Sequence, residues 1–598
     1  QWVATKHVWP ANDRTPGSPS RPLSVADFLQ MLIDFLRVND RVYAAEYSAE
    51  GMANDQPTFE LAAASQDWLM ASAHIRESGP LWISGLDEGL DGSAQKTLLD
   101  AAGCIFRRLQ QVDGKKDRAR MQVWIERLVT HHQGNLKKWL DEAETTDQHR
   151  HNWHVVMDLG LTLVRILFGE NVLSLGFRSL DKHDLKMLLE KYHAHPKALS
   201  SAFLKMVYDS LFAFEQGDPL RPRLAAGAAI RTVLSMFLNY KGSVLWKLNA
   251  GVGDAIFTPY YKLLKHRGVK FRFFHRVTAL RGAGGNINSI DIARQMRLKK
   301  GIADYDPLCR VGDLDCWPDR PRYEQLRKGR KLERRADNLE SFWCRWQFSG
   351  YEKARTLRRG RDFDAVILGI GPGAFQHLCK DLNSNRKWRR MVRSTATVQT
   401  QTMQLWPLLD LKELGWVHGP VQAGFETTGY STWVDMSHRL AEESWDLPKP
   451  ESSASFCGVL EDAPAIPDAD GWKFPRLQDD RVSACATHWL RTNVSHIWPE
   501  AFDPDGEFRE FILKTQHDVD VPGLSQQYFR ANIDPSDRCV LSLPGSVRHR
   551  LSAGESGFNN LFLAGDWVNN EFNVGCVEAA TLAGLAAARA VEQADLKQ

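Results

Sequence analysis

One stretch near the C-terminus decides the fold, Asn560-Leu561-Phe562-Leu563-Ala564-Gly565-Asp566-Trp567, which continues as Asn573-Val574-Gly575-Cys576-Val577-Glu578-Ala579-Ala580. The apolar run 561–564 predicts a buried strand. After it, Gly565 allows the backbone to approach a ligand closely, and the Asp566 carboxylate can accept hydrogen bonds from that ligand. Residues 577–591 are rich in Ala, Leu and Glu and predict a helix. Gly575 lies near its start, where free N–H groups favour an electron-rich oxygen.

This order of strand, Gly-Asp, loop, glycine and small-residue helix resembles the C-terminal FAD-binding segment of the flavin amine oxidase and phytoene desaturase superfamily. The resemblance implies that FAD is the cofactor, that Asp566 holds a cofactor hydroxyl or phosphate, and that the helix start faces the flavin carbonyl. The implied cofactor-binding residues here are Gly565, Asp566, Gly575, Cys576, Val577 and Glu578. Glu578 has a second interpretation, as a cap of its own helix. The alternative for the whole segment is an ordinary strand–loop–helix with Asp566 as a turn residue.

A second segment extends the resemblance. Residues 253–266 predict a helix, residues 269–274 predict a strand continued by 275–280, and residues 287–297 predict its neighbour. In the superfamily, the unit of this kind contacts the adenine end of FAD through a main-chain group, which the resemblance places at Val277. A main-chain contact depends on geometry, so the residue type at this position carries little information.

The N-terminal residues lack a feature of dinucleotide-binding proteins. Such proteins normally open with a strand, G-x-G-x-x-G and a helix, and residues 1–40 contain no such unit. Residues 369–374, Gly-Ile-Gly-Pro-Gly-Ala, match the G-x-G-x-x-A variant, but no strand ending in Asp or Glu follows at the right distance. We therefore interpret 369–374 as a structural turn, after a predicted hairpin at 356–368. The chain is expected to be a superfamily member without the N-terminal Rossmann segment.

These segments predict an α/β fold, α+β overall. A Rossmann-like, FAD-binding parallel sheet is built from discontinuous segments, with an inserted mixed substrate domain and a helical N-terminal block. Within that block, the apolar spacing predicts helices at 24–37, 94–111, 116–141, 155–168, 184–192, 200–214 and 224–239. The expected divisions are a helical substrate-side block at 1–240, FAD-binding segments at 241–300, 356–380 and 541–598, a polar and basic insertion at 301–355, and the substrate domain at 381–540, which opens with a strand at 398–406.

The overall composition of the chain limits the classes of partner and binding site that we expect. The chain has 598 residues and a net charge of +3, so no nucleic-acid partner is predicted. Nine cysteines without a C-x-x-C pair predict neither a metal site nor a disulfide scaffold, and favour a reducing, cytoplasmic compartment. The most apolar run, 155–168, is too short to span a membrane. The basic run 327–335 predicts a solvated face; contact with anionic lipid headgroups is the alternative, which implies peripheral membrane association.

The branch of the superfamily depends on the residue before Val577. Amine oxidases of this fold carry an aromatic side chain there, whereas this chain has Cys576 after Gly575. The sequence therefore favours an oxidoreductase that removes hydride from C–H bonds of an apolar, isoprenoid- or carotenoid-like substrate. The alternatives are an amine oxidase and a degenerate, flavin-free scaffold or binding protein. Flavin N5 would accept the hydride, and no side-chain base is evident in the sequence, so the catalytic residues stay unassigned.

Overall fold

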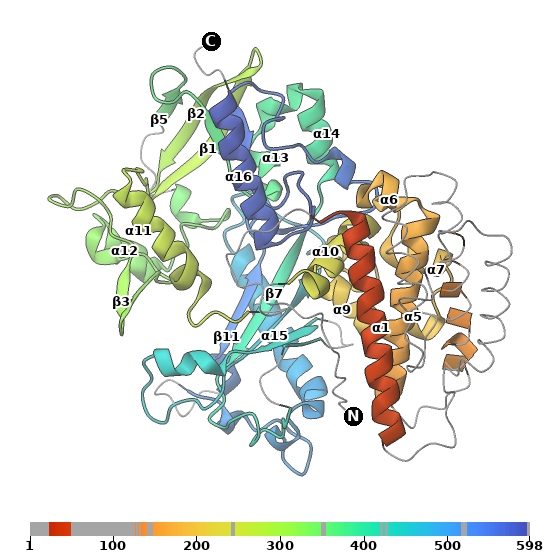
Figure 1. Cartoon of the computed structure of the whole chain (residues 1–598). Coiled ribbons are helices and arrows are strands. Elements are labelled where there is room, and N and C mark those ends of the chain that lie inside the picture. The colour runs from red at the N-terminus through yellow and green to blue at the C-terminus, as the bar shows by residue number, and fades with distance from the viewer. Residues whose placement is uncertain are drawn as a thin grey trace. The chain divides into compact units, whose positions relative to one another are not determined.

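The computed structural model describes residues 23–49, 148–240, 246–348, 355–418, 422–424, 429–515 and 523–594, with single helical residues between 123 and 141 (Figure 1). The chain divides into two compact units. The smaller contains residues 3–204 and 226–245, and the larger contains residues 1–2, 205–225 and 246–598. The helix predicted at 94–111 lies outside the described residues, as does most of the one predicted at 116–141.

The smaller unit is built from helices where it is described. They are α1 (Val25–Ala49), α5 (Gln148–Gly169), α6 (Val172–Leu175), α7 (Leu185–Lys191), α8 (Pro196–Leu199) and α10 (Ala226–Leu238). The helices predicted at 24–37, 155–168, 184–192 and 224–239 are confirmed. Asp184 starts α7 by accepting the N–H groups of Lys186 and Met187. None of the described helices is long and apolar enough to cross a membrane.

The larger unit contains an antiparallel sheet in the order β11-β7-β10-β9-β8. Its strands are β7 (Thr397–Leu405), β8 (Gln422–Gly424), β9 (Thr432–Asp435), β10 (Ala454–Leu460) and β11 (Tyr528–Asn532). β12 (Cys539–Val540) pairs with the first residues of β7. The strand predicted at 398–406 is confirmed as β7. One face of the sheet packs against α15 (Phe474–Asn493) in an aromatic core that includes Trp433, Phe456 and Trp489.

A second antiparallel sheet contains β1 (His275–Ala283), β2 (Asn286–Arg294) and β5 (Arg355–Arg358). A π-helical turn, Gly253–Phe257, and α11 (Thr258–His266) precede it, as the sequence predicts. The predicted strand at 269–274 is wrong, because β1 begins only at His275. Phe274 has a left-handed φ of 58°, which ends extended structure before β1. The ring of Phe271 instead packs on Tyr261, with 4.7 Å between centroids.

Two parallel strands lie in the core of the larger unit, β6 (Val366–Leu368) and β13 (Leu561–Leu563). The buried strand predicted at 561–564 is thus confirmed. The predicted hairpin at 356–368 is wrong, because β5 pairs with β2 whereas β6 pairs with β13. Asn560 joins the two sheets: its side chain accepts from Ile287 N at 2.7 Å and donates to Asp364 O at 3.2 Å. Within the described residues the predicted parallel sheet consists of this one pair.

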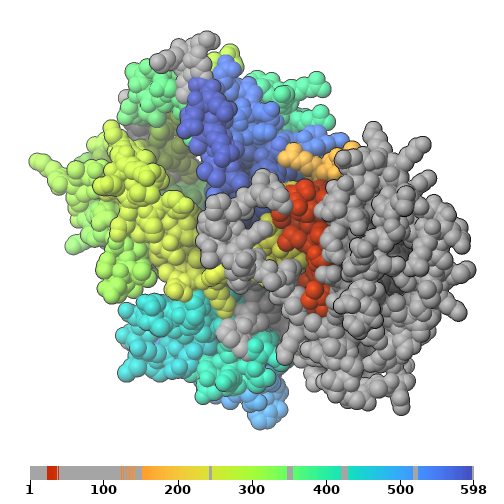
Figure 2. All heavy atoms as spheres, in the orientation of Figure 1, coloured from red at the N-terminus to blue at the C-terminus, as the bar shows by residue number. Residues whose placement is uncertain are grey.

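Three helices cover the parallel pair, α13 (Phe375–Leu378), α14 (Arg386–Ser394) and α16 (Val577–Gln593). The helix predicted at 577–591 is confirmed as α16. Its buried face carries only alanines at one-turn spacing, Ala579, Ala583 and Ala587, so the helix backbone can lie close to β13. The opposite face of α16 is at the molecular surface (Figure 2). The core around the pair includes Trp388 and Trp567, both almost fully buried.

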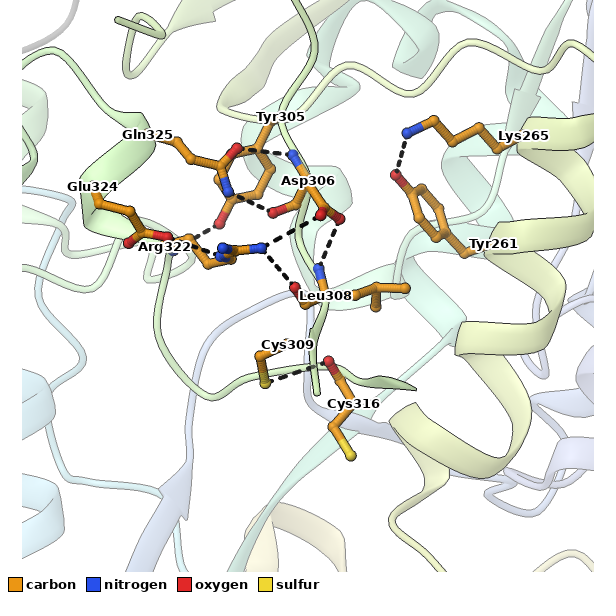
Figure 3. Close-up of polar contacts among 10 residues, drawn as sticks. All are labelled: Tyr261, Lys265, Tyr305, Asp306, Leu308, Cys309, Cys316, Arg322, Glu324 and Gln325. Carbon is orange, nitrogen blue, oxygen red and sulfur yellow. Dashed lines mark hydrogen bonds and ion pairs between the residues drawn. The ribbon is translucent and has the colours of Figure 1, made fainter. Parts of the chain in front are cut away.

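The basic segment between β2 and β5 is ordered by internal polar contacts (Figure 3). Arg322 N donates to the Tyr305 hydroxyl at 2.8 Å, and the Gln325 amide both donates to and accepts from the Asp306 backbone, at 2.8 and 3.0 Å. A small hairpin of β3 (Cys309–Val311) and β4 (Leu314–Cys316) projects from it. The basic run forms α12 (Gly329–Arg335), in which only Gly329 and Leu332 are buried. Most of the basic side chains therefore face solvent, as predicted.

Candidate functional site

The two parallel strands end at the same edge. Leu368 of β6 is paired with Leu563 of β13, and Ala564 N donates to Leu368 O at 3.0 Å. Open sheets with parallel strands bind ligands outside the carboxyl ends of those strands. Two loops begin here, residues 369–374 after β6 and residues 564–576 after β13. Each loop is a candidate site.

The glycine-rich loop after β6 is filled by protein. A Cβ atom on Gly371 would lie 2.3 Å from the carbonyl oxygen of Ser536, and one on Gly373 would lie 2.3 Å from that of Pro535. These glycines therefore allow another segment of backbone to pack against the loop. The helix that follows, α13, has only four residues. The structure thus supports the interpretation of 369–374 as a structural turn rather than a phosphate-binding loop.

The loop after β13 begins with a glycine that the packing requires. Gly565 has a φ of 135°, and a Cβ atom there would lie 2.5 Å from Nε1 of Trp567. The Trp567 ring is buried edge-on to Phe375, with 4.9 Å between centroids. Between the glycine and this anchored ring, Asp566 is held at the carboxyl edge of the strands. The Gly-Asp-Trp sequence therefore positions the Asp566 carboxylate.

Asp566 has a half-buried carboxyl group. Burial raises its pKa above the ordinary range, against the opposing effects of the nearby Arg550 guanidinium and of the N–H groups of Asp566 and Trp567. No ion pair involves Asp566 within the part of the chain that the structure describes. No basic side chain among these residues therefore pairs with the Asp566 carboxylate, whose oxygens can accept a hydrogen bond from a hydroxyl.

Arg550 holds the backbone at Asp566 in place. This buried guanidinium donates to Asp566 O at 3.0 Å, to Leu541 O at 3.2 Å and to Ser542 Oγ at 2.9 Å. Ser542 Oγ in turn donates to Asn573 O at 2.5 Å, which ties down the far end of the loop. Sequence analysis missed Arg550, because one arginine in a polar stretch carries no signal that its partners are backbone carbonyls.

The start of α16 meets Asp566. A Cβ atom on Gly575 would lie 3.4 Å from Asp566 Oδ2, so the glycine leaves this side of the carboxylate open. Cys576 is the N-cap, and its Sγ accepts from Ala579 N at 3.4 Å. Val577 is 68% exposed, and Glu578 is also exposed. The structure thus brings Gly565, Asp566, Gly575 and Cys576 together, with Val577 and Glu578 at the rim.

Two thiols connect this edge to the large antiparallel sheet. Burial raises the pKa of Cys539, on β12, to about 11, and the charge of Asp566 adds to the effect. Burial likewise raises the pKa of Cys457, on β10, to about 11, with smaller effects from Cys539 and Asp209. Both thiols are therefore neutral at physiological pH. Cys539 is paired with Val398, and Cys457 with Thr402, on the same face of β7, so both thiols lie on one face of the sheet.

The face of the sheet that carries Cys457 is polar. Directly paired residues of an antiparallel sheet lie on one face, and Cys457 is paired with Thr402 and Thr432, while Thr402 is also paired with Arg530. The next row contains Gln404 and Ser455 in the same way, whereas the aromatic core occupies the opposite face.

A buried carboxylate lies beside this row. Asp209 forms an ion pair with Lys205 at 2.6 Å, and burial raises its pKa, opposed by hydrogen bonds to Lys205 and Ser431. Sequence analysis missed Asp209. Nothing in the sequence shows that it would reach the sheet.

Val277 lies at a different cavity of about 750 Å³. The residue is 40% exposed and sits at an irregularity of β1, where the register shifts before Ala279. The cavity is also lined by Ile370 of the glycine-rich loop and by Phe342 and His377, whose rings are tilted by 40° with their centroids 4.4 Å apart. Asp566 is not among its lining residues. The structure therefore does not join Val277 and Asp566 in one cavity, although both loops that reach them start at one edge.

The residues present fit one end of an FAD molecule. Asp566 can accept from a hydroxyl, and the start of α16 can donate to a carbonyl. Within the described ranges, however, the glycine-rich turn that resembles a pyrophosphate loop is occupied by residues 535–536. A metal site finds no support in the same ranges, since no group of three His, Cys, Asp or Glu side chains could hold an ion.

Comparisons with known proteins add little to this geometry. No protein-family model and no curated protein matches the chain. The chain is similar to the structure of an oxidoreductase from Methanosarcina mazei, with 11% identity over 70% of this chain and 71% of that one and a TM-score of 0.35. It is also similar to a putrescine oxidase bound to putrescine, with 9% identity over 76% of this chain and 78% of that one and a TM-score of 0.36. At TM-scores this low, the likeness decides neither fold nor activity.

Proposed function

We propose that this chain is an FAD-dependent oxidoreductase that removes hydride from a C–H bond of its substrate. The observation that carries the proposal is the meeting of Asp566, Gly575 and the first turn of α16 at the carboxyl edge of β6 and β13. When bound, FAD supplies a hydride acceptor at its N5 atom. In this proposal Asp566 accepts a hydrogen bond from a cofactor hydroxyl, with Arg550 holding its backbone in place. The N–H groups of Val577 and Glu578 orient toward a cofactor carbonyl and favour negative charge there.

The substrate was predicted from Cys576 to be isoprenoid-like, and that remains a prediction. One observation favours a polar substrate instead, of which an amine is one class. The sheet face near Asp566 presents Thr402, Cys457, Thr432 and Arg530 in one row. A polar group that is buried against hydrocarbon without a partner costs about 1–3 kcal/mol. A carotenoid would cover several such groups and satisfy none, whereas a substrate with polar groups could bond them.

The cofactor proposal is tested by titrating the purified chain with FAD and following the quenching of flavin fluorescence. A hydrogen bond to a charged group contributes about 1.5–3 kcal/mol, so Asp566→Ala should weaken FAD binding roughly 30-fold. Asp479→Ala is the matched control, because Asp479 also accepts a backbone N–H, from Ala531 at 3.1 Å, away from the site. Absence of saturable FAD binding in the unaltered chain would favour the flavin-free scaffold. Equal affinities of the unaltered chain and Asp566→Ala would remove Asp566 from the site.

The substrate class is tested on the FAD-saturated chain under anaerobic conditions. A panel of primary and secondary amines is compared with a polyene hydrocarbon in detergent micelles. Bleaching of the flavin absorbance by an amine supports the polar interpretation. Bleaching by the polyene alone would restore the isoprenoid interpretation.

A further inference from the structure

One face of α14 is formed by basic side chains alone. These exposed residues, which we call the basic face, are Arg386, Lys387, Arg389, Arg390 and Arg393. With about 3.6 residues per turn they lie on one side of the helix, whereas Trp388 and Met391 on the other side are almost fully buried. Among the described residues, none of the five pairs with a carboxylate; Arg389 instead donates to Asn383 O at 2.9 Å. The fold therefore leaves the charge of this face uncompensated.

A neighbouring segment adds to the positive surface. The 3₁₀ turn Val547–His549 contacts α14 and carries exposed Arg548. Arg548 Nε donates to His549 Nε2 at 3.2 Å rather than to a carboxylate. Burial lowers the pKa of His549, and the charges of Arg390 and Arg548 lower it further. Cations of the two segments are therefore close enough to act on the same side chain.

This arrangement is unfavourable for the helix itself. Arg386 precedes Arg390 by four residues, and like charges at this spacing destabilise a helix. Arg389 and Arg393 repeat the arrangement. Arg386 and Lys387 also occupy the first turn, at the positive end of the helix macrodipole, where acidic residues would be favourable. A helix face that only had to be solvated could carry both signs of charge, so an anion outside the chain explains this one better.

The other basic helix, α12, is compensated within the fold. It contains Glu333, and the Arg335 guanidinium lies 2.6 Å from the Asp337 carboxylate and over the ring of Trp346, at 5.2 Å from its centroid. The basic run 327–335 was the candidate for lipid contact in the sequence. In the structure, α14 is the stronger candidate for an anionic partner, and α12 provides a control of similar charge.

The composition of the surface decides among anionic partners. No large apolar side chain is exposed on α14 or in the turn Val547–His549. Protein interfaces contain an apolar core, and proteins that bind single-stranded nucleic acid stack aromatic side chains on the bases. This surface offers neither feature. A membrane that contains anionic lipid needs charge alone, and each Lys or Arg near it strengthens binding about fivefold.

We propose that the basic face of α14, together with Arg548, docks on a membrane surface that contains anionic phospholipid. The guanidinium and ammonium groups pair with lipid phosphates and carboxylates. The contact is with the headgroups, because the surface has no apolar side chain to enter the hydrocarbon. It does not depend on the FAD site proposed above.

Flotation with vesicles tests the proposal, since aggregated protein does not float. The full chain, without FAD, is mixed with vesicles of phosphatidylcholine alone or with one third phosphatidylserine. We expect binding to the mixed vesicles only. Raising the salt from about 0.1 M to about 1 M shortens the Debye length from about 10 Å to about 3 Å and should abolish binding. Absence of binding, equal binding to both vesicles or binding that persists in salt would overturn the proposal.

A triple variant removes the central charges of the basic face. Arg389→Gln, Arg390→Gln and Arg393→Gln combined should weaken binding about 100-fold, because each charge contributes about fivefold. Its Tm should be unchanged or higher, since pairs of like charge are removed, so the loss would not come from unfolding. Lysine at the same three positions keeps the charge and should keep the binding. Loss of binding with lysine would show recognition by guanidinium geometry and overturn the proposal.

The matched control removes three charges from α12 through Arg330→Gln, Lys331→Gln and Arg334→Gln, all at exposed positions. This variant has the same net charge as the α14 variant and should bind within a few-fold of the unaltered chain. Equal loss of binding in the two variants would show an effect of net charge and overturn the proposal. A DNA duplex and poly-glutamate, each added at the same concentration of negative charge as the lipid, test the other partners. We expect the chain to stay on the vesicles, and displacement of most of it by either competitor would also overturn the proposal.

Discussion

Gly371→Ala should destabilise the larger unit, and Gly369→Ala should not. The two glycines belong to the same G-x-G-x-x-A motif, but they differ in their surroundings. A Cβ atom on Gly371 would lie 2.3 Å from Ser536 O, whereas one on Gly369 would meet nothing within 4 Å. Ordinary contact begins about 1 Å further out, so the alanine at position 371 must displace the backbone of residues 535–536.

The size of the effect follows from the nature of the neighbour. Overpacking a well-packed site typically costs about 1–3 kcal/mol. A backbone carbonyl cannot rotate away as a side chain can, so we expect the upper end, about 3 kcal/mol. At roughly 2 °C per kcal/mol for a large unit, Tm should fall by about 6 °C. Tryptophan fluorescence can follow the transition, because Trp388 and Trp567 both pack against Phe375 just beyond the turn.

The same pair of variants distinguishes the structural turn from a nucleotide site. In a phosphate-binding loop both glycines would matter, and the loss would fall on FAD affinity. In the structural interpretation, Gly371→Ala loses stability and Gly369→Ala keeps both stability and FAD affinity. An unaltered Tm for Gly371→Ala, together with weakened FAD binding by Gly369→Ala, would refute our reasoning.

Three further predictions concern the edge itself. The 598-residue chain should purify with little bound FAD, because residues 535–536 fill the glycine-rich turn; the flavin absorbance per chain after gel filtration measures this, and a stoichiometric yellow protein would contradict it. Burial raises the pKa of Asp566, so the native state holds its proton more tightly and loses stability as pH rises through that pKa. In the flavin-free chain, Asp566→Asn should therefore raise the free energy of unfolding in urea at neutral pH, with a gain that disappears at low pH; a gain independent of pH would exclude titration as its cause. The thiolate is the nucleophile that attacks N-ethylmaleimide, so at pH 8 Cys457 and Cys539, with pKa values of about 11, should be alkylated far more slowly than exposed Cys485, and equal rates would show that the two sites open readily.

Local patterns were enough to predict the main elements of the candidate site. The apolar run after Asn560 is β13, the Ala-rich stretch after Cys576 is α16, and the alternating residues from 398 form β7. Each of these depends on side-chain period and helix-forming composition, which are properties of neighbouring residues in the sequence. The position of Gly565 and Asp566 at the start of the loop after β13 follows from the sequence in the same way.

Only the tertiary structure decided which strands pair and which distant segments pack against each other. Residues 356–368 look like a hairpin in the sequence. However, Asn560, almost two hundred positions later in the chain, accepts from the backbone at Ile287 and donates to that at Asp364, and so directs the two strands into different sheets. Residues 269–274 are apolar enough for a strand, yet the left-handed Phe274 and the aromatic packing of Phe271 end that possibility.

The chemistry of the site divides in the same way. A Gly-Asp motif and a helix start are visible in the sequence, because they occupy fixed positions along the chain. The arginine that holds Asp566 and the carbonyls that occupy the glycine-rich turn are visible only in the tertiary structure. Hydrogen bonds and exclusion of one backbone by another act over a few ångströms between residues that are far apart in sequence, and no local pattern records them.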